Sequence, residues 1–583
     1  MRRLATMGSS RNLSAQKGAG RNWLNALSEA AGHRAFFWGL LAVIFIGVLA
    51  GHQSLEVIDR DEARFAQASK QMLLSGDLIT PYFMDELRAK KPIAIYWLQS
   101  ASAVIFGHLD IASYRLPSVL GILAALILTY KFAASLWPST RFLPIIAALL
   151  LAATPVMIGE AHLAKTDAVL LAAILCQQFY LWRIYQRHSL SDAAPRGSRL
   201  FIGFWAFMAA GILIKGPIAP LVALTTISML VILDRQVAWL AGLAVFRGSL
   251  ILAVLTLPWV VAVSYQTDGA FLDIAIRGDF LSKVKSGQES HGAPIGTYFG
   301  LLGLLFWPGI AFIGFLVWQG RDMLRHPASR FCVAWIAGYW LAIELVPTKL
   351  PHYVLPVLPA LALLVAGALV SPLPPASRIQ RGFILAGYIL AVIWGAVLVA
   401  ASLWLAISYG GRTGGWAFIW AVVISLLVSF VLWRLWNWYR GHHLGDLLAI
   451  CGAGLAVHLA LIAGLFASLS QIHIAHRLKN HIVSLPDRPA AIALVGYHEP
   501  SAVFHLGQDI LLLDVKQAAL FMAEAPDGLA IIEGRHRAEF IQLSQRLDQQ
   551  LAVSDTLSGV NISKGRDIQL FFYQHVAGSQ AAD

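Results

Sequence analysis

Residues 56–97 read EVIDRDEARFAQASKQMLLSGDLITPYFMDELRAKKPIAIYW, and the rest of the chain is organised around this stretch. It follows the first long apolar run, and its charges gather towards its two ends. Acidic and basic residues alternate over 59–64, and Lys90 and Lys91 stand just before a proline. Because charged side chains are costly inside a membrane and are usually functional beside one, we expect this stretch to be an outer loop that carries the chemistry.

Composition places the chain in a membrane. It has 583 residues, of which 58% are hydrophobic and only 13% are charged, with a mean hydropathy of +0.66. A soluble protein carries roughly 25% charged residues. The chain is therefore predicted to be a polytopic α-helical membrane protein. Its net charge of +12 is expected to report topology, and no nucleic-acid partner is expected.

Apolar stretches of roughly 17 to 25 residues are long enough to span a membrane as helices. Thirteen such stretches are predicted, at 35–51, 115–136, 142–159, 168–185, 200–215, 217–233, 249–266, 297–318, 331–347, 353–371, 383–408, 416–436 and 447–468. A fourteenth candidate at 93–107 is short and contains Gln99, Ser100 and Ser102.

The distribution of arginines decides whether 93–107 crosses the membrane. If it does not cross, the basic loops at 183–199, 235–247, 321–330, 378–381 and 434–440 all share the side of the basic N-terminal tail. That arrangement obeys the positive-inside rule, whereas a crossing would place all five loops outside. We therefore predict a re-entrant or surface-lying helix at 93–107, a cytoplasmic N-terminus and a C-terminal tail on the outer side.

Three regions follow from this topology. Residues 1–34 are expected to be a basic cytoplasmic tail, and residues 35–468 a transmembrane domain that carries the candidate catalytic residues, with 52–114 as its first outer loop. Residues 469–583 alternate short apolar runs with helical patterns, starting from a strand at 490–496, which predicts a small α/β domain. This tail has no Gly-rich phosphate loop, so we interpret it as a structural or acceptor-docking module.

The charges of the first loop have two interpretations. Asp61 and Glu62 either cap a solvated helix, where they suit the helix dipole, or act as a general base and charge stabiliser facing a cavity. Lys90 and Lys91 either anchor the loop to lipid headgroups or hold the phosphate of a lipid-linked substrate.

Three further outer loops bring polar groups to the same side of the membrane. They contain Glu160, His162, Lys165 and Asp167; Arg277, Asp279, Lys283, Lys285, Glu289 and His291; and Lys349, His352 and Tyr353. Cations suit a phosphate leaving group, and carboxylates suit a nucleophile or a developing oxocarbenium charge. His162, His291 and His352 are candidate metal ligands without metal-ligand spacing, so no metal or other cofactor is expected.

At these residues the sequence resembles a known family. RDEARFAQ, GDLITPYF and KKPIAIYW resemble the PDExRYAE…GDW…EKPPLxYW pattern of lipid-linked-sugar glycosyltransferases of the GT-C superfamily. The resemblance is strongest to undecaprenyl-phosphate aminoarabinose transferases, which modify lipid A, and weaker to protein O-mannosyltransferases. It continues at TDAVL, IKGPIA, SHGAPIGTYF, TKLPHYVLP and YHEPSAVFHLG.

The resemblance implies roles for individual residues. Asp61, with Glu62 beside it, and Asp167 match the acidic positions expected to be catalytic. Lys91 matches the lysine that holds the lipid phosphate, and Lys283 falls where relatives have a phosphate-contacting arginine; Lys215 and Lys349 are further candidates. The sugar or acceptor pocket is expected to involve Arg64, Arg88, Lys90, Tyr96, His162, His291, His352 and Tyr353. The pattern is broken at Arg88, Lys90 and His352, which leaves the sugar open.

The first hypothesis is a monomeric, inverting transferase that moves a sugar from a polyprenyl phosphate to lipid A or another envelope acceptor at the outer face of the bacterial inner membrane. A protein O-mannosyltransferase-like enzyme and a flippase for lipid-linked sugars are the alternatives. Charges gathered at one face, followed by a large outer domain, favour an enzyme over a transporter with mid-membrane broken helices.

Overall fold

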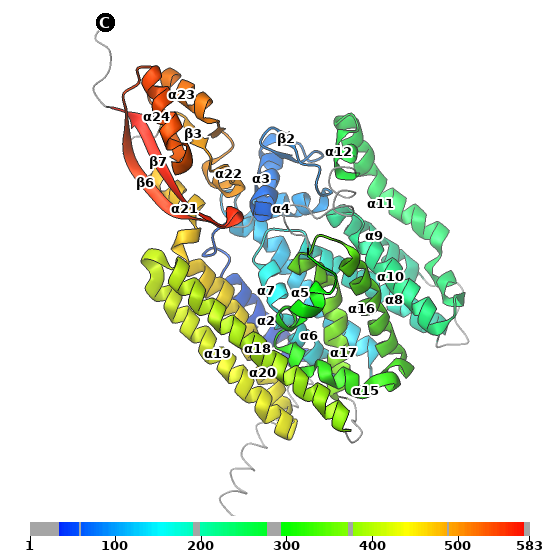
Figure 1. Ribbon diagram of the computed structural model, residues 1–583. Helices are drawn as coiled ribbons and strands as arrows, with labels where there is room; N and C mark the ends of the chain where they lie inside the picture. The colour runs from blue at the N-terminus through cyan, green and yellow to red at the C-terminus, as the bar shows by residue number, and fades with distance from the viewer. Residues whose placement is uncertain are drawn as a thin grey trace, which may run out of the picture.

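The computed structural model describes residues 34–57, 60–140, 142–189, 199–276, 293–370, 377–486 and 489–576. Over these ranges the chain forms a bundle of long helices, and a small sheet domain stands at one end of the bundle (Figure 1). The basic tail predicted at 1–34 lies outside the described residues except for Arg34, where the first described helix begins.

Many of the helices are long and apolar. Among the described residues, seven have the length and composition to cross a membrane, or nine if each of two bent pairs is one span. The seven spans contain α5 (Ile111–Leu136), α8 (Asp167–Ser189), α11 (Val245–Gln266), α17 (Leu358–Val370), α18 (Arg378–Tyr409), α19 (Gly414–Gly441) and α20 (Leu444–Leu459). One bent pair joins α6 (Leu143–Ala152) to α7 (Pro155–Ala161) at 67°, and the other joins α14 (Thr297–Leu305) to Gly309–Gly320, which includes part of α15 (Ile313–Arg325), at 108°.

The polytopic helical fold predicted from the sequence is confirmed. Each of the thirteen predicted stretches overlaps a helix or a bent pair, and the remaining matches are α2 (Arg34–Leu49), α9 (Leu200–Lys215), α10 (Ile218–Asp234) and α16 (Pro327–Leu345). Helices α2, α9 and α10 have only 16 or 17 residues, which is at the lower limit for a span. The count of thirteen crossings therefore stays a prediction.

The core of the bundle lies around α6 and α17. All ten residues of α6 are buried, whereas only 22% of the most apolar window of α18 and 28% of that of α19 are buried. Without a hydrophobic drive between helices in lipid, close packing of small residues holds them together. At Gly121 of α5, an added Cβ would lie 2.7 Å from the backbone of Ala168, so glycine lets α5 approach α8.

The first outer loop contains two packed helices and a short hairpin. Helix α3 (Arg60–Ser75) is followed by strands β1 (Tyr82–Phe83) and β2 (Glu86–Leu87) and by α4 (Ala94–Phe106). Ser69 donates to Gln99 at 2.7 Å, and Ser100 donates to the Ser69 carbonyl at 3.1 Å. These contacts give a reason for polar residues in the apolar stretch 93–107. With 13 residues, α4 is about 20 Å long, too short to cross a bilayer core.

The C-terminal region forms the predicted α/β domain. Its sheet has the order β4-β3-β5-β7-β6, formed by β3 (Ile492–Val495), β4 (Leu511–Leu512), β5 (Leu529–Glu533), β6 (Leu551–Asn561) and β7 (Arg566–His575). Strands β4, β3 and β5 are parallel, and β7 runs antiparallel to β5 and β6. The helices are α21 (Ile474–Val483), α22 (Pro500–Leu506), α23 (Val515–Glu524) and α24 (Arg537–Arg546). The strand predicted at 490–496 is β3.

The sheet domain is attached to the first outer loop through α22, which lies beside α3 (Figure 1). The Arg60 guanidinium donates to both carboxylate oxygens of Glu499, each at 2.7 Å, and Asn561 donates to the same carboxylate at 2.9 Å. Nearby, the rings of Phe504 and Tyr114 meet edge to face at 5.8 Å. The start of α3 is therefore fixed by the domain immediately before Asp61.

Candidate active site

Asp61 and Glu62 are adjacent on α3, but their side chains lie in different environments. The Asp61 side chain is 58% exposed, whereas the Glu62 side chain is completely buried. Arg115 of α5 donates to both Glu62 oxygens, at 2.7 and 3.0 Å, and the Ala164 amide donates at 2.9 Å. Glu62 thus joins α3 to α5 and to the loop before α8. This geometry favours a structural role for Glu62 over the catalytic role predicted for it.

Arg115 is a residue that the sequence analysis missed. Its guanidinium is fully buried and also donates to the carbonyls of His52 and Leu55, at 2.7 and 2.6 Å. One side chain therefore holds the turn that follows α2, helix α3 and helix α5 together. An arginine at the start of an otherwise apolar helix was the available signal, because such a charge is kept only where it is paired.

Asp61 lies in a positively charged environment. Partial burial raises its pKa, but Arg88, Lys165, Lys91 and Arg64 act more strongly together and hold the pKa below its usual value. The Arg64 guanidinium, one helical turn away, lies 3.9 Å from the Asp61 carboxylate. Asp61 is therefore ionised at neutral pH, as a group that orients an acceptor or accepts a proton must be.

A second carboxylate lies at the start of α8. Asp167 receives the Lys215 ammonium at 2.5 Å and the Thr166 hydroxyl at 3.3 Å. Lys215 ends α9 and also lies 5.9 Å from the centre of the Tyr353 ring. The predicted residues Asp167, Lys215 and Tyr353 are thus brought together from three separate segments.

Lys165 connects the two carboxylates. It interacts electrostatically with both Asp61 and Asp167, and its ammonium lies 3.5 Å from Glu160. His352 lies 3.9 Å from the same Glu160 oxygen and interacts electrostatically with both aspartates. The sequence analysis named Lys165 and Glu160 in this loop without assigning them a role, so it missed the interaction of Lys165 with both aspartates.

Arg88, one of the departures from the family pattern, is buried beside Asp61. Its Nε donates to the Tyr96 hydroxyl at 3.2 Å, and its guanidinium lies 4.8 Å from the centre of the Phe65 ring. Lys91 donates to the carbonyl of Lys90 at 2.9 Å, and the charge of Lys91 reaches Asp61. Arg88, Tyr96 and Lys91 therefore surround Asp61 from the β2–α4 side of the loop.

The contacts of Lys349 argue against its predicted role in phosphate binding, and those of His162 argue against its predicted role in the sugar or acceptor pocket. The Lys349 ammonium donates to the carbonyls of residues 343, 344 and 346 at 2.6 to 3.1 Å, so it caps the end of α16 rather than lying ready for a phosphate. His162 is completely buried, bonded to the Ile158 carbonyl at 2.8 Å and packed against His52. Lys283 and His291 lie outside the described residues.

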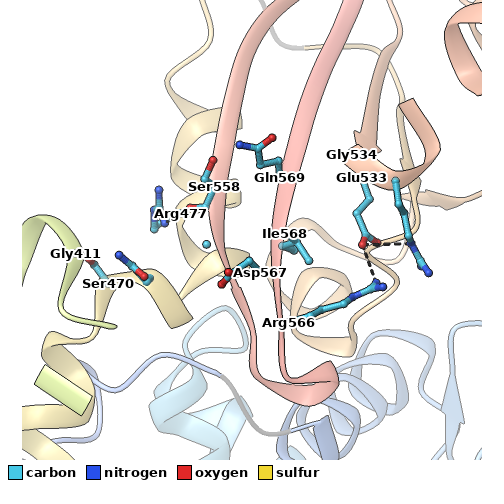
Figure 2. Close-up of a pocket in the computed structure, with 13 residues that line it drawn as sticks. Gly411, Ser470, Arg477, Glu533, Gly534, Ser558, Arg566, Asp567, Ile568 and Gln569 are labelled. Carbon is cyan, nitrogen blue, oxygen red and sulfur yellow. Dashed lines mark hydrogen bonds and ion pairs between the residues drawn. The ribbon is translucent and has the colours of Figure 1, made fainter. Parts of the chain in front are cut away.

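A wide pocket lies elsewhere, between the β6–β7 hairpin and the bundle (Figure 2). Its volume is about 900 Å³, and its lining includes Gly411, Arg477 and Gln569. Arg566 and Arg535 also line it, and both pair with Glu533, at 2.7 and 3.3 Å. None of the residues that line this pocket belongs to the cluster around Asp61 and Asp167.

The helical bundle, the outer loop and the terminal sheet domain define a GT-C type of membrane fold. ArnT from Cupriavidus metallidurans, solved with undecaprenyl phosphate bound, superposes with a TM-score of 0.73 at 19% sequence identity. The match covers 94% of this chain and all of that chain. The apo form of the same protein gives a TM-score of 0.71 at 18% identity. At such identities the likeness establishes the fold.

Sequence relatives agree with this resemblance. The family model of dolichyl-phosphate-mannose-protein mannosyltransferases matches residues 35–267. An undecaprenyl phosphate-alpha-4-amino-4-deoxy-L-arabinose arabinosyl transferase of Yersinia pestis (strain Pestoides F) is 27% identical over 336 residues, 56% of this chain and 58% of the relative. A transferase of the same description from Proteus mirabilis is 26% identical over 52% of this chain and 54% of its own length. The alignments thus span little more than half of these relatives, and the predicted resemblance to aminoarabinose transferases is confirmed.

Proposed function

We propose that this protein is an integral-membrane glycosyltransferase that moves a sugar from a polyprenyl-phosphate donor to lipid A or another cell-envelope acceptor. The proposal rests on one cluster of charges. Lys165 interacts electrostatically with both Asp61 and Asp167, while Lys91 acts on Asp61 and Lys215 forms an ion pair with Asp167. Carboxylates and ammonium groups in one cluster suit a reaction that develops positive charge on a sugar and negative charge on a phosphate. The names of the sequence relatives support the choice of donor.

The proposed step is a direct displacement at the anomeric carbon. An acceptor oxygen forms a bond to this carbon while the bond to the phosphate oxygen breaks, which releases polyprenyl phosphate and inverts the anomeric configuration. Lys91 and Lys165 stabilise the phosphate, and Asp61 orients the acceptor or takes its proton. If the acceptor is already an anionic phosphate, Asp61 acts by positioning alone. Asp167, held by Lys215, stabilises charge near the sugar.

The topology and the partners belong to the same proposal. The donor chain lies in the bilayer of a bacterial inner membrane, the N-terminus is cytoplasmic, and the reaction and the sheet domain are periplasmic. The protein acts as a monomer on membrane-embedded substrates, without nucleic acid and without a catalytic metal. The concentration of arginines in the loops opposite the cluster supports this orientation.

Asp61→Asn tests the proposal. Purified protein in detergent, given a polyprenyl-phosphate-linked aminopentose and lipid A, should transfer the sugar, and Asp61→Asn should lower the rate by about 100-fold or more. Asp85→Asn, on an exposed position of the same loop, is the matched control and should keep the wild-type rate. Wild-type turnover by a normally abundant Asp61→Asn protein would contradict the role of Asp61.

The same assay separates the alternatives. A flippase needs a sealed bilayer, so transfer in detergent supports an enzyme. The match to the protein mannosyltransferase family model gives a specific reason to test a polypeptide acceptor as well. Sugar transferred to a peptide but not to lipid A or another envelope glycolipid would replace the proposed acceptor and leave the donor chemistry in place.

A further inference from the structure

Three potential metal ligands from distant segments meet where the sheet domain contacts the first outer loop. Glu56 precedes α3, His476 lies on α21, and His505 lies on α22. The Glu56 Oε2 atom is 2.9 Å from His476 Nδ1 and 3.8 Å from His505 Nε2. The three ligand atoms all lie within 4.8 Å of one another. This cluster contains none of the histidines that the sequence analysis considered as ligands.

The ligand types point to a particular class of metal. Two imidazoles and one carboxylate suit Zn²⁺ and similar transition metals, whereas Mg²⁺ and Ca²⁺ require mostly oxygen ligands. Bonds of 2.0–2.1 Å in a tetrahedral site place ligand atoms about 3.3 Å apart. Two of the three observed separations, 2.9 and 3.8 Å, bracket this value, and the third is at most 4.8 Å, so modest side-chain movements suffice.

One detail distinguishes this cluster from an ordinary ion pair. The His505 side chain is only 7% exposed, and its Nε2, which faces Glu56, has no hydrogen-bond partner among the described residues. A buried polar atom without a partner is costly, and a metal bond would satisfy it.

The charges around the cluster also bear on which metal ion it can bind. The positive charges of Lys70 and Lys479 act on His505, and Glu56 is the only acidic member of the cluster. A cation attracted by charge alone would therefore be held weakly. Binding must come from the nitrogen–metal bonds, which again favours a transition metal over an alkaline-earth ion.

We propose that Glu56, His476 and His505 bind a Zn²⁺ ion that fastens the sheet domain to the first outer loop. Glu56 is five residues before Asp61, so the ion would stabilise the start of α3 together with the Arg60–Glu499 pair. The site is separate from the cluster of Asp61 and Asp167 and has a structural role. It does not depend on the proposed function.

The test is metal binding by the full-length protein in detergent after treatment with a chelator. Wild-type protein should bind one Zn²⁺ per chain in competition with a chromophoric chelator, and Zn²⁺ but not Mg²⁺ should raise its melting temperature. His505→Gln and His476→Gln should each weaken binding by about 100-fold and remove the thermal shift. His481→Gln is the matched control, because His481 lies on α21 and also pairs with a carboxylate, Asp555, at 3.1 Å.

Co²⁺ provides a measurement that needs no variant. Bound in place of Zn²⁺, it should give the intense visible absorption of a tetrahedral ion, and its X-ray absorption should indicate two imidazole nitrogens. Less than 0.1 Zn²⁺ per wild-type chain would overturn the proposal, as would unchanged binding in the double variant His476→Gln/His505→Gln. If the variants fail to fold, an octahedral Co²⁺ spectrum of the wild type would overturn it equally.

Discussion

Asp61 and Glu62 show how neighbouring carboxylates acquire separate tasks. Successive residues on a helix point about 100° apart, so one side chain can reach the membrane domain while the next stays near the surface. Glu62 is held by Arg115 and by a backbone amide, which fixes the rotation of α3. With α3 held in this way, Asp61 stays among the cations that lower its pKa.

Replacing Arg88 should change the pH dependence of transfer. Partial burial raises the pKa of Asp61, and Arg88 is the strongest of the charges that lower it. Removal of this charge in Arg88→Gln should raise the pKa, so the acidic limb of the rate profile should move to higher pH. Rates measured between pH 3 and 8 would check this. Arg88→Lys keeps the charge and should keep the limb; an equal movement in both variants would contradict the electrostatic explanation.

At the scale of elements, the buried Glu62–Arg115 pair joins α3 to α5. Removing one partner of a buried ion pair leaves an uncompensated charge, which typically costs about 3–5 kcal/mol. Arg115→Met should therefore lower the melting temperature of the purified protein strongly, because the Glu62 carboxylate stays buried without its cation.

Glu62→Gln/Arg115→Met is the matched control for this prediction. Both charges are removed, so the double variant should be more stable than Arg115→Met alone. Thermal unfolding of the wild type, both single variants and the double variant completes the cycle. A loss of stability in the double variant equal to the sum of the two single losses would show that the charges do not stabilise each other.

The fold of the whole molecule was largely predictable, because apolar stretches of about 20 residues are explained only by a membrane. The strands of the C-terminal domain were equally predictable, because short apolar runs in the sequence form buried strands. All five residues of β5, for example, are buried. The contacts of the candidate site were not predictable in the same way. Glu62 and Arg115 are 53 residues apart and Arg60 and Glu499 are 439 apart, and no local pattern in one sequence connects such pairs.

The Arg60–Glu499 pair should make the attachment of the sheet domain depend on pH. Burial raises the pKa of Glu499, but hydrogen bonds from Arg60 and Asn561 outweigh burial and lower it. A lowered pKa means that the pair contributes its full stability above the usual glutamate range and loses it as the pH falls through the lowered value. Hydrogen exchange at α3 and α22 in metal-free buffer should therefore be slow at pH 7 and less protected, after correction for the intrinsic rate, below pH 4.

Glu499→Gln removes the carboxylate charge, so α3 and α22 should already be less protected from hydrogen exchange at pH 7. Because residue 499 no longer titrates in this variant, its protection should not fall further in acid for this reason. Glu524→Gln, at an exposed position on α23, should behave as the wild type. Since Arg60 directly precedes Asp61, loosening the pair should also slow transfer while the sheet domain itself stays folded. Unchanged exchange at α3 in Glu499→Gln would mean that the domain is held by its other contacts, such as Phe504 against Tyr114, and that this ion pair adds little.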